Sequence, residues 1–232
     1  AWHTQLDKPV KQKTQKFPTQ YLGPEYSTEE ITTFLNSIGA KYTLHKKDQL
    51  ARIIATKLSE GKIVGWFQGR MEFGARALGN RSILADPRNP AMQKDLNLKI
   101  KFREGFRPFA PIVLKEIAND WFDCENESPY MLFVHEILSS RRLKVPSKQN
   151  KLTIQEKLKQ IRSSIPAVTH VNYTARIQTL SKEMNSDLYS LISKFFELTG
   201  CPMLVNTSMN VRGEPIVCSP IDAYKFFMSA EL

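Results

Sequence analysis

Residues 62–85 read KIVGWFQGRMEFGARALGNRSILA, two short apolar runs joined by a polar loop. The runs 62–67 and 82–85 predict buried strands, because each is short, continuous and bounded by turn-forming residues. From Gly65 to Arg81 the chain contains three arginines, one glutamate and four glycines. A guanidinium binds phosphate or carboxylate with two parallel hydrogen bonds, and glycine lets backbone N–H groups approach the same anion. The stretch therefore predicts an anion site between two strands of a sheet.

The flanking sequence mixes helical and extended patterns without strict alternation. Ser27 and Glu30 form a capping-box pattern before a helix that ends at Gly39, and a second helix with helical apolar spacing ends at Gly61. Further helices are expected from Asn89 to about Lys101, over 185–198 and from Ser219 onwards; further strands are expected at 109–114, 132–138, 167–171, 176–180 and 203–205. We expect 167–171 to pair with 176–180 across a turn at Asn172. The pattern predicts an α/β fold with a mixed sheet.

The excess of basic residues lies outside the predicted core. The net charge is +10, and residues 1–17 carry +3 while residues 139–166 carry +7. The remaining residues hold 21 basic and 21 acidic side chains. No aromatic residue interleaves the basic run from Arg141 to Arg162, as it would in many nucleic-acid-binding segments. We interpret 139–166 as a basic insert with a solvated surface, and a nucleic-acid partner is not favoured.

Length and composition limit the classes of protein to which the chain can belong. A chain of 232 residues that is 41% hydrophobic can bury one domain, which we place at 21–232 after a linker or tail at 1–20. The apolar runs are too short to span a membrane, and the polar start predicts no signal peptide. Three cysteines at widely spaced positions are typical of reduced thiols in a cytoplasmic protein rather than of disulfides or a zinc site.

Three further polar groups follow or precede predicted strands. They are REGFRPFAP with Arg103 and Arg107, THVNYTARIQT with His170 and Arg176, and NTSMNVRGEP from 206 to 215. Polar side chains beyond strand ends are where α/β folds bind ligands. These groups, and the arginine loop at 65–81, each have an ordinary interpretation when taken alone. Arg76 can form a surface ion pair with Glu72 four residues earlier, and His170 can be a core histidine with its hydrogen bonds made inside the protein. Asparagine and serine are common in turns. Their convergence on loops beside separate strands favours an anion-binding cleft.

The four motifs together resemble a known family. GWFQGRMEFGARALGNRSILADPR at 65–88, FREGFRPFAPIVL at 102–114, VTHVNYTARIQT at 168–179 and TGCPMLVNTSMNVRGEPIVCSP at 199–220 are similar to the C-terminal domain of the NodU/CmcH family of O-carbamoyltransferases. They occur in the family's order, and the resemblance runs from about Leu22 to the end. Four long motifs in order are far more specific than a single glycine pattern.

The resemblance implies a fold and an activity. It implies a YrdC-like α/β twisted open mixed sheet with flanking helices and a concave active surface. This domain would bind carbamoyl phosphate and ATP and form a carbamoyl-adenylate. A separate N-terminal domain of ATPase fold would pass the carbamoyl group to a hydroxyl acceptor. ATP is then a co-substrate and Mg²⁺ is held through substrate phosphates, with no metal site on the protein; a homodimer stays open.

The resemblance also assigns residues. It implies phosphate and carbamoyl contacts, the catalytic set, from Arg70, Arg76, Arg81 and Arg107. Substrate or nucleotide contacts are expected from Glu72, Asn80, Ser82, Arg103, His170, Arg176, Asn206, Ser208, Asn210 and Glu214. This chain departs from the family pattern at Ala75, where proline is common, at Asn172, where aspartate is common, and at Tyr173, where a small residue is common. Two other classes stay open: a nucleotide- or RNA-binding module, and a docking domain without its own catalysis.

Overall fold

A computed structural model describes residues 19–145, 152–158 and 160–230. The predicted linker or tail at 1–20 lies almost entirely outside the described residues, as does the centre of the basic insert at 139–166. Within the described ranges, no helix is both long and apolar enough to cross a membrane.

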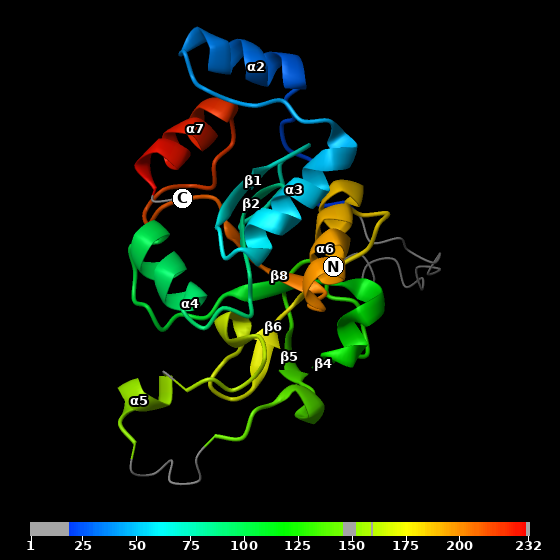
Figure 1. Cartoon of the computed structure of the whole chain (residues 1–232), viewed down its shortest axis with the longest axis vertical. Helices are drawn as coiled ribbons and strands as arrows, with labels where there is room; N and C mark the ends of the chain where they lie inside the picture. The colour runs from blue at the N-terminus through cyan, green and yellow to red at the C-terminus, as the bar shows by residue number, and fades with distance from the viewer. Residues whose placement is uncertain (1–18, 146–151, 159, 231–232) are drawn as a thin grey trace, which may run out of the picture.

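A mixed five-stranded sheet forms the centre of the molecule (Figure 1). Its order is β1 (Val64–Phe67), β2 (Arg81–Ala85), β8 (Met203–Ser208), β3 (Ala110–Leu114) and β7 (Gln178–Leu180). Neighbours from β1 to β3 run antiparallel, whereas β3 and β7 are parallel. β2 and β3 are buried at every position. The apolar runs 83–85 and 110–114 predict this burial, whereas Arg81 and Ser82 of β2 are buried polar residues. The predicted α/β fold with an open mixed sheet is confirmed.

Two long helices lie side by side over this sheet (Figure 1). α3 (Lys47–Ser59) buries Ala51, Ala55 and Leu58, and α6 (Ser186–Thr199) buries four apolar side chains in the same core. The Asn185 side chain caps α6, and Gly200 ends it with a left-handed φ of 70°. Both ends of α6 are therefore encoded locally, and the helix expected over 185–198 is confirmed.

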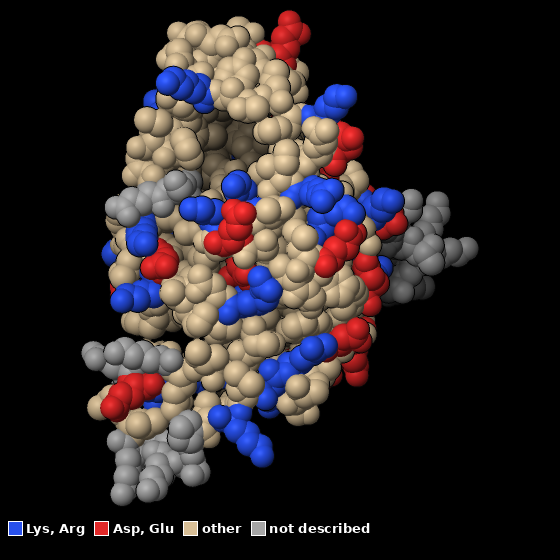
Figure 2. Space-filling view, viewed as in Figure 1, with Lys and Arg blue, Asp and Glu red and all other residues tan. Residues whose placement is uncertain are grey.

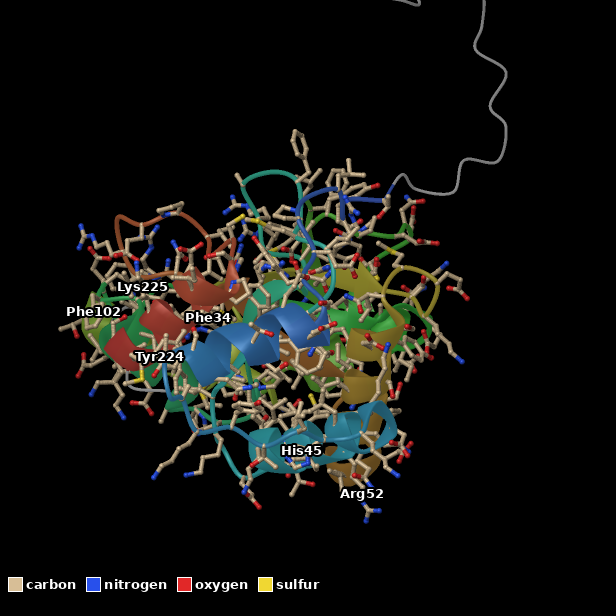
Figure 3. All side chains as sticks on the ribbon, turned by 90° about the horizontal axis from the view of Figure 1, so that it is seen from above. Phe34, His45, Arg52, Phe102, Tyr224 and Lys225 are labelled. Atoms are coloured by element: carbon tan, nitrogen blue, oxygen red, sulfur yellow. The ribbon has the colours of Figure 1, made fainter. Side chains whose placement is uncertain are left out.

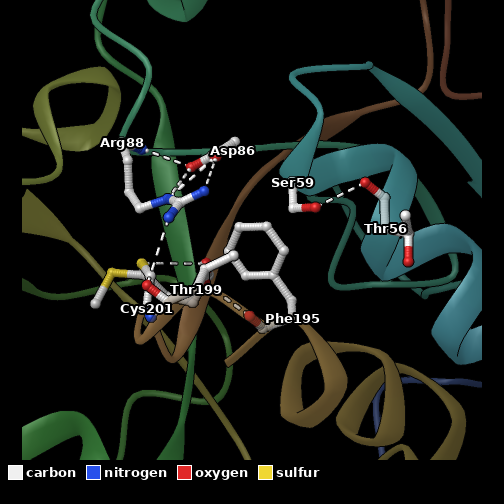
Figure 4. Close-up of polar contacts among 8 residues, drawn as sticks. Thr56, Ser59, Asp86, Arg88, Phe195, Thr199 and Cys201 are labelled. Carbon is white, nitrogen blue, oxygen red and sulfur yellow. Dashed lines mark hydrogen bonds and ion pairs between the residues drawn. The ribbon is translucent and has the colours of Figure 1, made fainter. Parts of the chain in front are cut away.

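An ion pair between a buried aspartate and a half-buried arginine links the end of β2 to the C-terminus of α6 (Figure 4). The Arg88 guanidinium and the Asp86 carboxylate are 2.6 Å apart, and Arg88 also donates to the carbonyl oxygen of Thr199. The same guanidinium lies 5.4 Å from the centre of the Phe195 ring. The pair thus holds the sheet and the helix in fixed relative positions.

Helices α2 (Thr28–Ser37) and α7 (Pro220–Ser229) lie together at one end of the molecule. Each begins with a complete capping box, so the predicted starts are confirmed. Phe34 and Tyr224 join them edge to face, with ring centres 6.1 Å apart (Figure 3). α2 has no buried residue, and Figure 2 shows a hollow in the surface beneath it.

A second, three-stranded antiparallel sheet stands beside the first. It consists of β4 (Phe122–Asp123), β5 (Val134–Ile137) and β6 (Thr174–Arg176), and two 3₁₀ helices, Lys115–Asp120 and Ser139–Arg141, flank β4 and β5. Only the buried residue Ile177 separates β6 from β7 of the large sheet. One extended segment of chain therefore belongs to both sheets.

The described parts of the basic insert fold against the small sheet. They include α5 (Ile154–Leu158) and an antiparallel bridge between Arg142 and Ser163. Arg142 pairs with Glu136 of β5, and its guanidinium lies 5.3 Å from the Tyr173 ring centre. On the face in Figure 2, acidic and basic side chains are intermixed.

Three predicted elements differ from the structure. Residues 167–171 are not a strand, because Pro166 starts a 3₁₀ helix at Pro166–Val168, and the predicted pairing with 176–180 is wrong: β6 pairs with β5 and β7 with β3. The helix expected from Asn89 starts later, as α4 (Met92–Asp95), and continues as a π-helix at Leu96–Ile100. β8 extends to Ser208, so 206–208 lie within a strand rather than after it.

Candidate active site

A cleft of about 440 Å³ lies where the two sheets meet. Such a volume is in the range of small-molecule sites. Four guanidinium-bearing side chains line it, Arg76 from the loop between β1 and β2, Arg103 and Arg107 from the loop before β3, and Arg176 at the end of β6. The other lining residues are Ala75, Ala77, Pro108, Phe109, Ala110, Met131, Val134, His170, Asn206, Thr207 and Ser208. The lining contains no carboxylate.

The arginines of the cleft repel one another. Burial lowers the pKa of Arg176 first and the charge of Arg76 lowers it further, while burial and then Arg107 lower the pKa of Arg103. Among the described residues, no ion pair includes any of the four. Several guanidiniums held together without an acid are stabilised when an anion binds between them.

The loop that carries Arg76 is built around the buried carboxylate of Glu72. One oxygen of Glu72 accepts hydrogen bonds from three backbone N–H groups, those of Leu78 and Asn80 at 2.7 Å and that of Arg81 at 3.2 Å. The side chain is 4% exposed. Glu72 therefore folds the second half of the loop back onto the first and lies outside the cleft lining.

Arg81 fills the interior of the same loop. It is fully buried, donates to the carbonyl oxygens of Gln68, Gly69, Asn80 and Pro24, and lies 3.7 Å from the Phe67 ring centre. Both terminal nitrogens donate to the backbone, Nε has no hydrogen-bond partner among the described residues, and Arg81 does not line the cleft. The sequence predicted that Arg81 contacts phosphate. In the structure its guanidinium holds the backbone of the loop and of Pro24 together.

Residues 20–24, which we call the N-terminal strap, run beside the first half of this loop. Gly23 N–H donates to the Met71 carbonyl, Met71 N–H to the Pro24 carbonyl, and Phe73 N–H to the Gln20 carbonyl, all within 2.9 Å. The hydroxyl of Tyr21 donates to the Leu78 carbonyl in the second half of the loop. The strap thus fixes both halves around Arg76.

Gly23→Val is expected to destabilise the protein by about 1–3 kcal/mol, because a β-carbon on Gly23 would lie 2.9 Å from the Met71 β-carbon. Urea unfolding measures the change. Gly105→Ala is the control, since its new β-carbon would meet the Lys94 side chain at an ordinary 3.6 Å. Equal stability of Gly23→Val and the wild type would contradict the close contact described for the strap.

The buried side chain of Asn97, in the π-helix, organises the loop of Arg103 and Arg107. Its amide nitrogen donates to the Arg107 carbonyl at 2.8 Å, and its oxygen accepts from the Arg103 guanidinium at 2.6 Å. Arg103 also lies 5.1 Å from the Phe109 ring centre. A π-helical turn is common near functional sites, and here it places an asparagine under two arginines.

Lys101 is a buried cation that sequence reasoning missed. Its ammonium group donates to the backbone carbonyl and side-chain oxygens of both Ser208 and Asn210. Burial, and next the charge of Arg103, lower its pKa to about 7. Lys101 therefore holds the end of β8 beside the cleft, and Asn210 is occupied with Lys101 and Ser208.

The free energy of unfolding is expected to rise with pH from about 7 towards 10.5 because of Lys101. Its pKa is lower in the folded chain than its ordinary value of 10.5, so the unfolded chain binds one more proton in that window. The slope from one proton is about 1.4 kcal/mol per pH unit. Urea unfolding of the wild type and Lys101→Met across pH 6.5–9.5, without added anion, measures it; equal slopes would contradict the prediction.

The loop at His170 turns sharply between the 3₁₀ helix and β6. His170 N–H donates to the Thr174 carbonyl, and Tyr173 has a left-handed φ of 62°. A tyrosine adopts this left-handed conformation only at a cost in free energy, so the turn holds Tyr173 in a strained backbone. In this chain the Tyr173 ring packs against Arg142 of the insert.

The structure brings half of the predicted residues into one cleft. Those lining it are Arg76, Arg103, Arg107, His170, Arg176, Asn206 and Ser208. The other seven lie outside the lining: Arg70, Glu72, Asn80, Arg81, Ser82, Asn210 and Glu214. Arg70 is exposed, Asn80 and Ser82 bond within the β1–β2 loop, and the Glu214 carbonyl accepts from Asn210. Sequence reasoning missed Lys101 and Asn97, because their roles depend on hydrogen bonds that no sequence motif indicates.

The chain is therefore an α/β domain with an arginine-lined cleft at the junction of two sheets. Residues 55–232 match the family described as Carbamoyltransferase C-terminus. The chain belongs to that family of transferase domains.

Relatives agree with this assignment. The chain is 49% identical to an uncharacterized protein of Synechocystis sp., over 100% of this chain and 38% of that protein. It is 42% identical to nodulation protein NolNO of Sinorhizobium fredii, over 91% and 29%, and 37% identical to nodulation protein NolO of Bradyrhizobium diazoefficiens, over 94% and 37%. The chain therefore spans about a third of the length of these relatives.

A solved structure of full-length HypF in the phosphate- and nucleotide-bound form is also similar. The TM-score is 0.48 at 15% identity, over 82% of this chain and 21% of that chain. This likeness is too slight to carry an argument about the site.

Proposed function

We propose that this domain binds carbamoyl phosphate and ATP in the arginine-lined cleft and forms a carbamoyl-adenylate. One observation carries the proposal: four arginines from three segments line one cleft that contains no carboxylate. Carbamoyl phosphate, ATP and pyrophosphate are polyanions that repel one another, so bringing them together requires several cations around one space. Family membership supports the carbamoyl group as the one transferred.

The proposed reaction has two balanced steps. Water attacks the phosphorus of carbamoyl phosphate, the bond from phosphorus to the carbamoyl oxygen breaks, and carbamate and inorganic phosphate form. A carbamate oxygen then attacks the α-phosphorus of ATP, and pyrophosphate leaves with the electrons of the broken P–O bond. The arginines position the reactants and neutralise their charge, so neither step needs a side-chain nucleophile.

Magnesium has no evident protein ligand in this cleft. The lining lacks acidic side chains, and no group of three or more His, Cys, Asp or Glu side chains comes together in the described part of the chain. We propose that Mg²⁺ enters with the phosphates of ATP, and no step above depends on a metal site of the protein. The acceptor hydroxyl and the N-terminal ATPase-fold domain that would use it are also part of the proposal.

Carbamoyl-phosphate-dependent exchange of labelled pyrophosphate into ATP tests the proposal, with the protein as its gene encodes it. Exchange that requires carbamoyl phosphate is the expected result. No exchange at saturating substrates would overturn adenylate formation. Binding of double-stranded RNA at moderate salt, without exchange, would instead support the RNA-binding alternative.

A further inference from the structure

We propose that the Nε2 atom of His170 accepts an N–H of the carbamoyl group and so selects carbamoyl phosphate over other acyl phosphates. The inference rests on the proposed function and deepens it. The cleft is rich in donors, because its four guanidiniums carry only N–H groups. A carbamoyl group differs from an acetyl group by an NH₂, which needs an acceptor.

The hydrogen bonds around His170 fix which ring nitrogen is the acceptor. Thr174 has one hydroxyl proton, and it donates this proton to the side-chain oxygen of Asn172 at 2.8 Å. The Thr174 oxygen also lies 2.9 Å from Nδ1 of His170. Since its only proton is engaged, the Thr174 oxygen accepts there, and Nδ1 carries the hydrogen. In a neutral imidazole, Nε2 then holds the lone pair.

Nε2 has no hydrogen-bond partner among the residues that the structure describes. His170 lines the arginine cleft and also a second hollow of about 900 Å³ on the other side of Pro108. Asn206 is a weaker choice for the acceptor. Its side-chain oxygen is also unpartnered but is closed off from solvent, and its amide nitrogen is bound to Gln178 and Ala77.

The charges around His170 keep its ring neutral. Burial lowers its pKa, and next the charge of Arg176 lowers it further. The other charged groups in the two hollows that it lines are all cations: Arg76, Arg103 and Arg107 in the cleft, and Lys94 and Arg162 in the second hollow. No carboxylate lines either space, so protonation is opposed from both sides.

Protonation of His170 would convert the acceptor into a donor and add a positive charge. The added charge would attract every phosphate ligand of the cleft, but only carbamoyl phosphate would also lose a hydrogen bond. Acid should therefore weaken the binding of carbamoyl phosphate relative to acetyl phosphate, which has no NH₂ group to donate, and a purely structural histidine would not give that difference.

The test compares dissociation constants for carbamoyl phosphate, acetyl phosphate and inorganic pyrophosphate by calorimetry from pH 5 to 8. We divide the dissociation constant of acetyl phosphate by that of carbamoyl phosphate, because this ratio cancels the protonation of the phosphate group that both ligands share. In the wild type we expect carbamoyl phosphate to bind at least tenfold more tightly than acetyl phosphate at pH 7.5. The ratio of the two dissociation constants should fall towards one in acid. Nitrogen NMR of labelled histidine should show Nδ1 protonated at pH 7.5.

Three variants sharpen the result. His170→Ala should give a ratio near one at every pH, and His170→Gln, which keeps an acceptor oxygen, should retain part of the preference without pH dependence. Asn172→Asp places a carboxylate beside Thr174, raises the pKa of His170, and should move the fall in the ratio to higher pH.

A tenfold preference that persists in His170→Ala would overturn the inference, and so would a wild-type ratio that does not change with pH. If His170→Ala loses carbamoyl-phosphate-dependent exchange but keeps its preference for carbamoyl phosphate over acetyl phosphate, the histidine acts as a base that activates water. That result would also overturn the inference. If the wild type binds none of the three ligands, the proposed function fails as well; if it binds both acyl phosphates equally, only the role of His170 fails.

Discussion

Arg76→Ala is expected to lower carbamoyl-phosphate-dependent exchange by about 10²–10³-fold, the usual effect of removing one preorganised cationic or donor group from a polyanion site. Arg76 lines the cleft, has no acidic partner among the described residues, and lies close enough to Arg176 to lower the pKa of that guanidinium. Its charge is therefore directed at whatever anion the cleft holds. Initial exchange rates at several carbamoyl phosphate concentrations measure the loss.

The matched control removes an exposed arginine that does not line the cleft. Arg52 is exposed on α3, where Figure 3 labels it. Arg52→Ala carries the same change in net charge and should alter exchange less than threefold, because Arg52 is exposed, its charge is screened by salt, and it does not line the cleft. Similar losses in the two variants would mean that only general charge matters, and would contradict a specific site at Arg76.

Glu72→Ala is expected to lower the free energy of unfolding by about 3 kcal/mol or more. The change leaves three buried backbone N–H groups without an acceptor and removes the counter-charge nearest to the buried Arg81. Urea unfolding followed by circular dichroism measures the difference. The loop should also lose its shape, so anion binding should weaken even under conditions where the protein remains folded.

Glu72→Gln distinguishes the hydrogen bonds from the charge. Glutamine keeps one carbonyl oxygen in place of the oxygen that accepts all three bonds, so its loss should be less than half that of alanine. If glutamine and alanine are equally destabilising, the carboxylate acts through its charge on Arg81 rather than through the backbone of the loop.

Local signals explain which parts of the fold were predictable. The capping boxes at Ser27 and Ser219 and the left-handed Gly200 act within a few residues, and each marked a real helix end. The segment 167–171 looked extended by composition, but Pro166 starts a 3₁₀ turn there. The partners of β6 and β7 depend on strands far away in sequence, which periodicity cannot identify.

The same distinction holds for the site. Arg76, Arg107 and Arg176 could be proposed because arginine on a loop beside a strand is a local pattern. Whether an arginine faces an anion or its own backbone is not local: Arg81 donates to Pro24, 57 positions away. Lys101 escaped prediction because its acceptor Ser208 lies 107 positions along the chain.

Two segments of the chain join the sheets that form the cleft: Ile177 links β6 to β7, and the 3₁₀ helix Lys115–Asp120 links β3 to β4. Arg176 lies at the end of β6 in the small sheet, and Arg76 approaches from the large sheet. The like charges on the two walls repel each other, and a multiply charged anion bound between them removes that repulsion. Because salt screens this repulsion, we expect anion binding in the cleft to relieve less repulsion, and so to gain less from it, as ionic strength rises.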